Sequence, residues 1–131
     1  MENPKILVVE DENSVALDIK NRLTKLGYSV TDVTSTGEDA IKKAEENKPD
    51  LVLVDIILKG EIDGIEAARH IHDNLDIPIV YLTAYADDDL IERAKHTKPY
   101  GYILKPFQNK DLRSNIEIAL YNNNVAQNCN D

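Results

Sequence analysis

Apolar runs alternate with amphipathic segments along almost the whole chain. Strands are predicted from short apolar runs at residues 6–9, 51–54, 79–82 and 100–104, and an edge strand from the more mixed segment 28–34. Helices are predicted from apolar residues at helical spacing in segments 13–26, 37–47, 65–75, 87–96 and 109–121. Strands and helices that alternate in this way form a parallel sheet covered by helices on both faces. The pattern therefore predicts an α/β domain of five strand–helix units.

The ends of the first and last predicted helices carry further signals. Asn13 or Ser14 is suited to cap the first helix, and Gly27 fits the position just beyond its end. Residues 122–131 are polar and show no apolar periodicity. We therefore expect a folded domain over residues 1–121, followed by a disordered polar tail over residues 122–131.

Length and charge narrow the class of protein. A chain of 131 residues corresponds to one domain. Its 15 basic and 24 acidic residues give a net charge of −9, which disfavours direct binding of nucleic acid or of an anionic membrane. The first residues do not have the pattern of a signal peptide, so we expect none, and no apolar stretch approaches the roughly 20 residues of a membrane span. Since Cys129 is the only cysteine, neither an intrachain disulfide nor a cysteine-based zinc site can form. We expect a cytoplasmic protein.

Polar residues of a particular kind follow four of the predicted strands. In an open parallel sheet, ligands bind beyond the carboxyl ends of the strands. The residues at those ends are Glu10, Asp11 and Glu12 after the first strand, Asp55 after the third, Thr83 after the fourth and Lys105 after the fifth. Carboxylates suit Mg²⁺, and a carboxylate can accept a phosphoryl group as a nucleophile. A magnesium ion, an ammonium and a hydroxyl are the groups that would stabilise the charge on phosphoryl oxygens.

Each of these residues also has an ordinary structural explanation. Acids at the end of a strand often cap the next helix, and a single Asp such as Asp55 is usually a turn residue. Thr83 and Lys105 carry little information by themselves. Turn chemistry does not readily account for four strands that each deliver a suitable side chain at the same end, so we favour a phosphoryl site.

The sequence resembles the receiver domain of two-component response regulators over residues 5–121. The matching stretches, in order along the chain, are residues 6–12, 49–55, 63–66, 78–84 and 101–107. The resemblance implies a flavodoxin-like, doubly wound parallel sheet with strand order 2-1-3-4-5.

The resemblance also implies a role for each matching residue. Asp55 is the expected phosphoacceptor. Asp11, Asp55 and the backbone carbonyl of Ile57 are the expected Mg²⁺ ligands, and Glu10 would act through a bound water. Thr83 and Lys105 would contact the phosphoryl oxygens, and Tyr102 would be an aromatic switch that moves with Thr83. The family usually has a cis Lys105–Pro106 peptide at this place, which an X–Pro bond tolerates.

One departure from the family pattern concerns the loop after Asp55. This loop, residues 56–64, is one residue longer than the commonest pattern and lacks a proline that is usual there. The departure affects the geometry of the loop and its contacts with partners, and leaves the chemistry intact.

We predict a phosphoacceptor of a two-component or phosphorelay system, and no enzyme beyond slow autodephosphorylation. The expected partners are a sensor histidine kinase or phosphotransfer protein and a downstream protein target. The expected output face comprises helix 87–96, strand 100–104 and helix 109–121, and it is also the candidate surface for a homodimer.

An aspartate-nucleophile phosphatase or phosphotransferase is one alternative, but it typically needs a second acid where Ile57 stands. A pseudo-receiver that binds only protein is the other, and the set of Asp11, Asp55, Thr83 and Lys105 argues against it.

Overall fold

The computed structural model of the chain describes residues 3–58, 60–83, 88–97 and 99–129. Ala84, the last residue of the matching stretch 78–84, and Asp87, the first residue of the predicted helix 87–96, lie outside the described residues. The elements in chain order are β1 (Lys5–Val9), α1 (Asn13–Lys25), β2 (Ser29–Thr34), α2 (Gly37–Asn47), β3 (Leu51–Asp55), α3 (Gly64–Leu75), β4 (Ile79–Thr83), α4 (Asp88–Lys95), β5 (Gly101–Leu104) and α5 (Asn109–Cys129). The predicted alternation of strands and helices is confirmed.

The strands form one parallel sheet in the order β2-β1-β3-β4-β5, as the resemblance implied. This order places β2 at an edge and confirms the prediction made from its mixed composition. Val9 pairs with Val54 and Asp55 pairs with Leu82, while Thr83 pairs with Leu104. This register brings the carboxyl ends of β1, β3, β4 and β5 to the same edge of the sheet.

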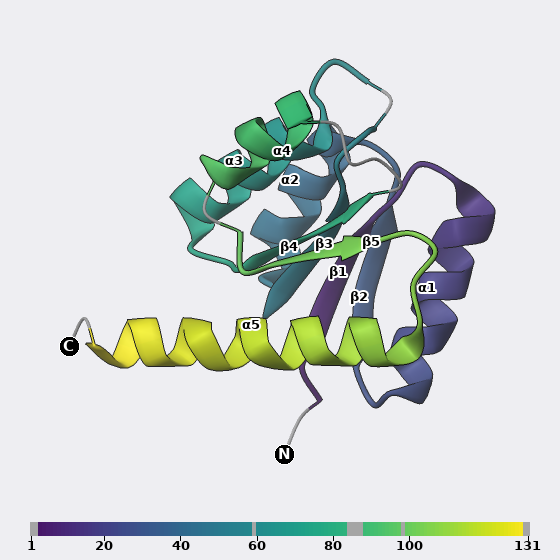
Figure 1. Cartoon of the computed structure of the whole chain (residues 1–131), viewed down its shortest axis with the longest axis vertical. Coiled ribbons are helices and arrows are strands. Elements are labelled where there is room, and N and C mark those ends of the chain that lie inside the picture. Colours follow the sequence, from purple (N-terminus) through teal and green to yellow (C-terminus); the bar gives the residue numbers. More distant parts are fainter. Residues whose placement is uncertain (1–2, 59, 84–87, 98, 130–131) are drawn as a thin grey trace.

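Two apolar layers flank the sheet. On one face, Val52, Val54 and Tyr81 pack with α2, α3 and α4; on the other, Leu53 and Leu82 pack with α1 and α5. Figure 1 shows the same division, with α2, α3 and α4 together on one side. Because β3 and β4 are covered on both faces, every residue of both strands is buried. Their continuous apolar sequence follows from that position.

The prediction that Asn13 or Ser14 caps α1 is wrong. The cap position is Glu12, whose side chain makes no capping hydrogen bond, and the helix begins at Asn13. The backbone N–H of Ala16 donates to the Glu12 carbonyl, so the first turn closes one residue earlier than predicted. Gly27 does lie just beyond the helix with a φ of 98°, as predicted.

The last helix continues beyond the end near Tyr121 that the apolar pattern predicts. α5 runs for 21 residues to Cys129 and extends past the sheet in Figure 1. Residues 122–129 contain neither Gly nor Pro, so no residue in them strongly breaks a helix that is already formed. The division into a domain over 1–121 and a tail stays a prediction. Neither α5 nor any other helix of the described residues is both long and apolar enough to cross a bilayer.

A buried pair of hydroxyl groups joins β4 to the end of α4. The Tyr81 hydroxyl lies 2.6 Å from Thr97 Oγ1, and that oxygen also lies 2.6 Å from the Ala94 carbonyl, to which it donates. Burial raises the pKa of Tyr81 to about 12, so its hydroxyl stays protonated at neutral pH. The pair fixes the end of α4 against the strand that leads to Thr83.

Candidate functional site

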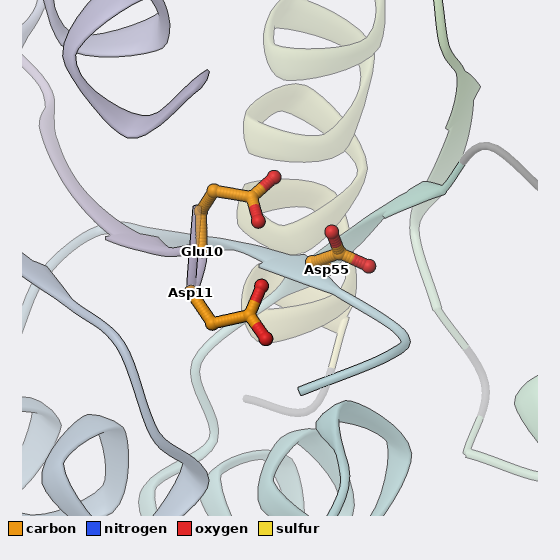
Figure 2. Close-up of side chains that lie close together, drawn as sticks. All are labelled: Glu10, Asp11 and Asp55. Atoms are coloured by element: carbon orange, nitrogen blue, oxygen red, sulfur yellow. The ribbon is translucent and has the colours of Figure 1, made fainter. Parts of the chain in front are cut away.

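Three carboxylates gather at the carboxyl edge of the sheet. Glu10 and Asp11 directly follow β1, and Asp55 is the last residue of the neighbouring β3. One oxygen from each lies within 4.8 Å of the others, and Figure 2 shows the three side chains close together. The sequence prediction that these acids converge is confirmed by their positions.

Lys105 lies against two of these acids. Its Nζ donates to Glu10 Oε1 at 2.6 Å and to Asp55 Oδ2 at 2.8 Å. The side chains of Glu10 and Asp55 are 1% and 9% exposed, and that of Lys105 is 18% exposed. A charge-assisted contact with so little access to solvent is stronger than an exposed ion pair, and it offsets part of the cost of burying two carboxylates.

Backbone amides hold the other oxygens of the two acids. The Ile57 N–H donates to Asp55 Oδ1 at 2.9 Å, and the Glu12 N–H donates to Glu10 Oε2 at 3.2 Å. Both donors lie two residues after the acid that they contact. The turns after β1 and β3 therefore orient these carboxylates as well as positioning them.

The electrostatics of the edge favour a cation. Burial raises the pKa of Glu10 to about 7; the Lys105 hydrogen bond opposes this shift, and the nearby charge of Asp55 adds to it. For Lys105, burial lowers the pKa, but hydrogen bonds with Asp55 and Glu10 outweigh that effect and raise it. The Lys105 ammonium therefore stays charged, and further positive charge near Glu10 would favour the ionised form of that carboxylate.

The raised pKa of Glu10 predicts that the metal-free protein loses stability as the pH rises. Below the ordinary pKa of 4.5, the carboxyl is protonated in both the folded and the unfolded chain. As the pH rises from there through about 7, the unfolded chain ionises freely, whereas the folded protein must ionise a buried group. Urea unfolding in EDTA at about pH 5 and about pH 8 should show this loss in wild type and less of it in Glu10→Gln. Equal losses in the two proteins would contradict the assignment to Glu10.

The donor set suits magnesium. Asp11 and Asp55 offer carboxylate oxygens that converge, and hard oxygen ligands of this kind are those that Mg²⁺ takes from proteins. Glu10 engages Lys105 directly, and this contact is compatible with an indirect role for Glu10 toward an ion. The residues present therefore fit the metal that the sequence predicted.

The remaining predicted residues lie at or near the same edge. Thr83 is the buried last residue of β4, and its carbonyl accepts the backbone N–H of Lys105 at 2.8 Å. Tyr102 pairs with Tyr81 across β4 and β5 and packs, partly buried, against the core on the α4 side. Ile57 is the second residue of the loop after Asp55 and is 44% exposed. The Lys105–Pro106 peptide is cis, as the resemblance implied.

Sequence reasoning missed the direct contact between Lys105 and Glu10. The two residues are 95 positions apart, and the resemblance paired Lys105 only with phosphoryl oxygens. The order of the strands was the available signal. β1 and β5 lie on either side of β3 and β4, so the residues that follow β1 and β5 can meet over the ends of those two central strands.

Comparison with known protein families gives one match that spans most of the chain. The model described as the response regulator receiver domain matches residues 6–117. This range includes the three acids, Thr83 and Lys105.

Curated relatives are regulators longer than this chain. The transcriptional regulatory protein PdtaR of Mycobacterium tuberculosis is 38% identical over 116 residues, which cover 88% of this chain and 56% of the relative. The alkaline phosphatase synthesis transcriptional regulatory protein PhoP of Bacillus subtilis is 34% identical over 125 residues, covering 95% and 51%. The chain thus spans about half the length of these relatives.

Solved structures agree with the fold and extend over nearly the same range. The signal receiver domain of a modulated diguanylate cyclase from Desulfovibrio desulfuricans G20 aligns with a TM-score of 0.92 at 35% identity, covering 95% of this chain and 99% of that chain. The N-terminal domain of a response regulator/sensory box/GGDEF three-domain protein from Carboxydothermus hydrogenoformans aligns with a TM-score of 0.82 at 38% identity, covering 92% and 98%.

Proposed function

Because the chain belongs to the family of response regulator receiver domains, we propose that it accepts a phosphoryl group on Asp55 from a phosphohistidine of a sensor kinase or phosphotransfer protein. The observation that carries this proposal is the cluster of Asp55 with Lys105, Glu10 and Asp11 at one edge of the sheet. We further propose a cytoplasmic location, where such a donor would be met.

In the proposed transfer, a carboxylate oxygen of Asp55 attacks the phosphorus atom. A new P–O bond forms while the P–N bond to histidine breaks, and the histidine nitrogen keeps the electron pair of that bond. The Ile57 N–H and the Lys105 ammonium fix the orientation of the carboxylate before attack. Since each carboxylate oxygen has more than one lone pair, these hydrogen bonds leave Asp55 able to act as a nucleophile.

Magnesium is the proposed cofactor. Asp11, Asp55 and the Ile57 carbonyl would hold it directly, and Glu10 would act through a water. When bound, Mg²⁺ supplies positive charge that neutralises the carboxylates and the phosphoryl oxygens. Lys105 adds a second positive charge, and the Thr83 hydroxyl is proposed to donate to a phosphoryl oxygen once the group is in place.

A groove beside Lys105 suits the phosphodonor protein. It lies between α1 and the segment after β5, where Val15, Pro106 and Phe107 form its apolar part. The Arg22 guanidinium carbon lies 5.4 Å from the centre of the Phe107 ring, and Arg22 Nη1 donates to Asn109 Oδ1 at 2.7 Å. These contacts hold the two walls together, so a partner seated here finds a preformed surface next to the lysine that touches Asp55.

We propose that phosphorylation changes the surface formed by α4, β5 and α5, and that this surface carries the output and any homodimer contact. Thr83 ends the strand to which α4 is fixed through Tyr81 and Thr97. Tyr102 lies on the neighbouring strand on the same face, so a movement of Thr83 can be followed by that ring. Phosphorylation then acts as a bias between two arrangements of the same packed elements.

A phosphoacceptor accounts for the site better than a phosphatase. The position two residues after Asp55, where such an enzyme typically has a second acid, is Ile57. The hydrocarbon side chain of Ile57 can neither donate nor accept a proton. The curated relatives described above are named as regulators. We therefore propose no turnover of phosphoesters.

The test is incubation of the wild-type chain with Mg²⁺ and a small phosphodonor such as acetyl phosphate. We expect one acid-stable, base-labile phosphoryl adduct that mass spectrometry of peptides places on Asp55, and no adduct when EDTA is present. Beryllofluoride should bind at the same residue as a stable analogue of the phosphoryl group. Absence of any Asp55 adduct favours a pseudo-receiver, and continuous release of phosphate from phosphoesters favours an enzyme.

A further inference from the structure

We propose that Glu38, on α2, is a positioning residue for the metal-binding edge of the sheet. Its carboxylate contacts the loop between β3 and α3, of which the structure describes residues 56–58 and 60–63, and thereby fixes the Ile57 carbonyl in the place where an ion would use it. This inference rests on the proposed function, because the ion is the proposed Mg²⁺.

The carboxylate of Glu38 meets the loop at two points. The backbone N–H of Ile62 donates to Glu38 Oε1 at 3.1 Å, although the two residues are 24 positions apart. Gly60 approaches the other oxygen so closely that a Cβ on Gly60 would lie 3.1 Å from Glu38 Oε2. Gly60 also has a φ of 113°, a conformation that residues with a side chain rarely adopt. The loop is therefore shaped to lie against this carboxylate.

An apolar contact accompanies the polar one. A Cβ on Gly37, the residue before Glu38, would lie 2.6 Å from Ile62 Cγ1 and 2.9 Å from Ile62 Cδ1. The Ile62 side chain thus rests directly on the backbone of the first turn of α2. The outer half of the loop, residues 60–63, is fixed to α2 by the side chain and the backbone amide of Ile62.

The inner half of the loop, residues 56–58, is fixed to β3, the strand that ends at Asp55. The Ile57 N–H donates to Asp55 Oδ1 at 2.9 Å, and Ile56 and Leu58 are buried. The Gly64 N–H donates to the Ile56 carbonyl at 3.0 Å and closes the loop at its base. Ile57 itself is exposed, so its carbonyl depends for its position on the contacts of its neighbours rather than on packing of its own side chain.

Restraint of both halves matters for ion binding because ordering a loop costs conformational entropy. A longer loop has more conformations to lose, and this loop is one residue longer than the commonest pattern of the family. If Glu38 already restricts the loop, an ion that binds the Ile57 carbonyl bears less of that cost and binds more tightly. Loss of the contact should therefore appear as weaker magnesium binding.

Three variants separate positioning from charge. Glu38→Ala removes the acceptor and one negative charge, Glu38→Gln removes the charge but keeps an Oε1 acceptor, and Asp39→Ala removes a second acid from the same first turn of α2. All three change the net charge equally. They therefore alter the long-range attraction of a cation, and the helix-terminal charge, in similar ways.

We expect titration calorimetry of the unphosphorylated protein to give a Kd for Mg²⁺ that is about three- to tenfold higher in Glu38→Ala than in Asp39→Ala, the size of one lost hydrogen bond. Glu38→Gln should stay within about twofold of Asp39→Ala. Amide hydrogen exchange of Ile62 should be faster in Glu38→Ala alone.

Two results would overturn the inference in different ways. If wild type binds Mg²⁺ and forms the Asp55 adduct, but Glu38→Ala and Asp39→Ala share one Kd, the contact is only structural and the proposed function stands. If wild type neither binds Mg²⁺ nor forms the adduct, the proposed function fails and the role of Glu38 fails with it.

Discussion

Replacement of Asp55 by asparagine is expected to abolish the phosphoryl adduct while leaving the fold intact. An amide oxygen is a far poorer nucleophile than a carboxylate oxygen, and Asp55 is the carboxylate that both Lys105 and the Ile57 N–H hold in place. Wild type and Asp55→Asn should be compared with acetyl phosphate and Mg²⁺, with the adduct located by mass spectrometry.

The fold should survive because asparagine has the shape of aspartate and removes one of two neighbouring buried charges. Its Oδ1 can still accept from the Ile57 N–H, and Lys105 keeps its 2.6 Å contact with Glu10. The charge of Asp55 raises the pKa of Glu10, so its removal eases the ionisation of Glu10. We expect the free energy of unfolding in EDTA to stay within about 1 kcal/mol of wild type.

Asp50→Asn is the matched control, because Asp50 directly precedes β3 and so lies at the end of that strand opposite Asp55. Asp50 accepts the Lys5 N–H at 2.7 Å. This variant should accept phosphate like wild type. Full labelling of Asp55→Asn, or loss of labelling in Asp50→Asn, would contradict the assignment of the phosphoacceptor.

The alternation of strands and helices was predictable because each strand of this sheet carries a local signal, whereas the strand order came from the resemblance. β3 and β4 are covered on both faces, so their sequences are continuously apolar, and β2 at the edge is mixed. Helix ends were harder to predict. Glu12 serves as the first cap position without a side-chain hydrogen bond, and α5 continues through polar residues that no apolar stripe marks.

The members of the site were predictable, whereas several of their contacts were not. Parallel strands bring Glu10, Asp11 and Asp55 to one edge whatever their side chains do, so position along the chain was enough to group them. The contact of Lys105 with Glu10 and that of Glu38 with Ile62 depend on side-chain direction and on the path of a loop. Neither leaves a periodic trace in the sequence, because each joins residues that are far apart.

Gly64→Ala is expected to cost about 3 kcal/mol of folding free energy, because a side chain at this position has no space. A Cβ on Gly64 would lie 1.9 Å from the Asp55 carbonyl oxygen and 2.9 Å from that of Ile56. Both obstacles are backbone atoms, so relief requires the start of α3 to move away from the end of β3. Helix propensity alone predicts the opposite sign, since alanine is favoured over glycine in a helix by about 1 kcal/mol.

Gly27→Ala separates this steric effect from the general cost of replacing a glycine. Gly27 has a φ of 98°, but apart from Gly27 and its two chain neighbours no atom of the described residues lies within 4 Å of the place that a Cβ would take, so alanine there should cost only about 1 kcal/mol of backbone strain. Urea unfolding of both variants measures the difference in their free energies of unfolding, and acetyl phosphate labelling reports on the site.

Because Asp55 shares the backbone that must move, Gly64→Ala should also lose labelling at temperatures where it remains folded, whereas Gly27→Ala should not. A Gly64→Ala protein as stable as wild type would show that α3 does not lie as closely against the phosphoacceptor strand as the structure indicates.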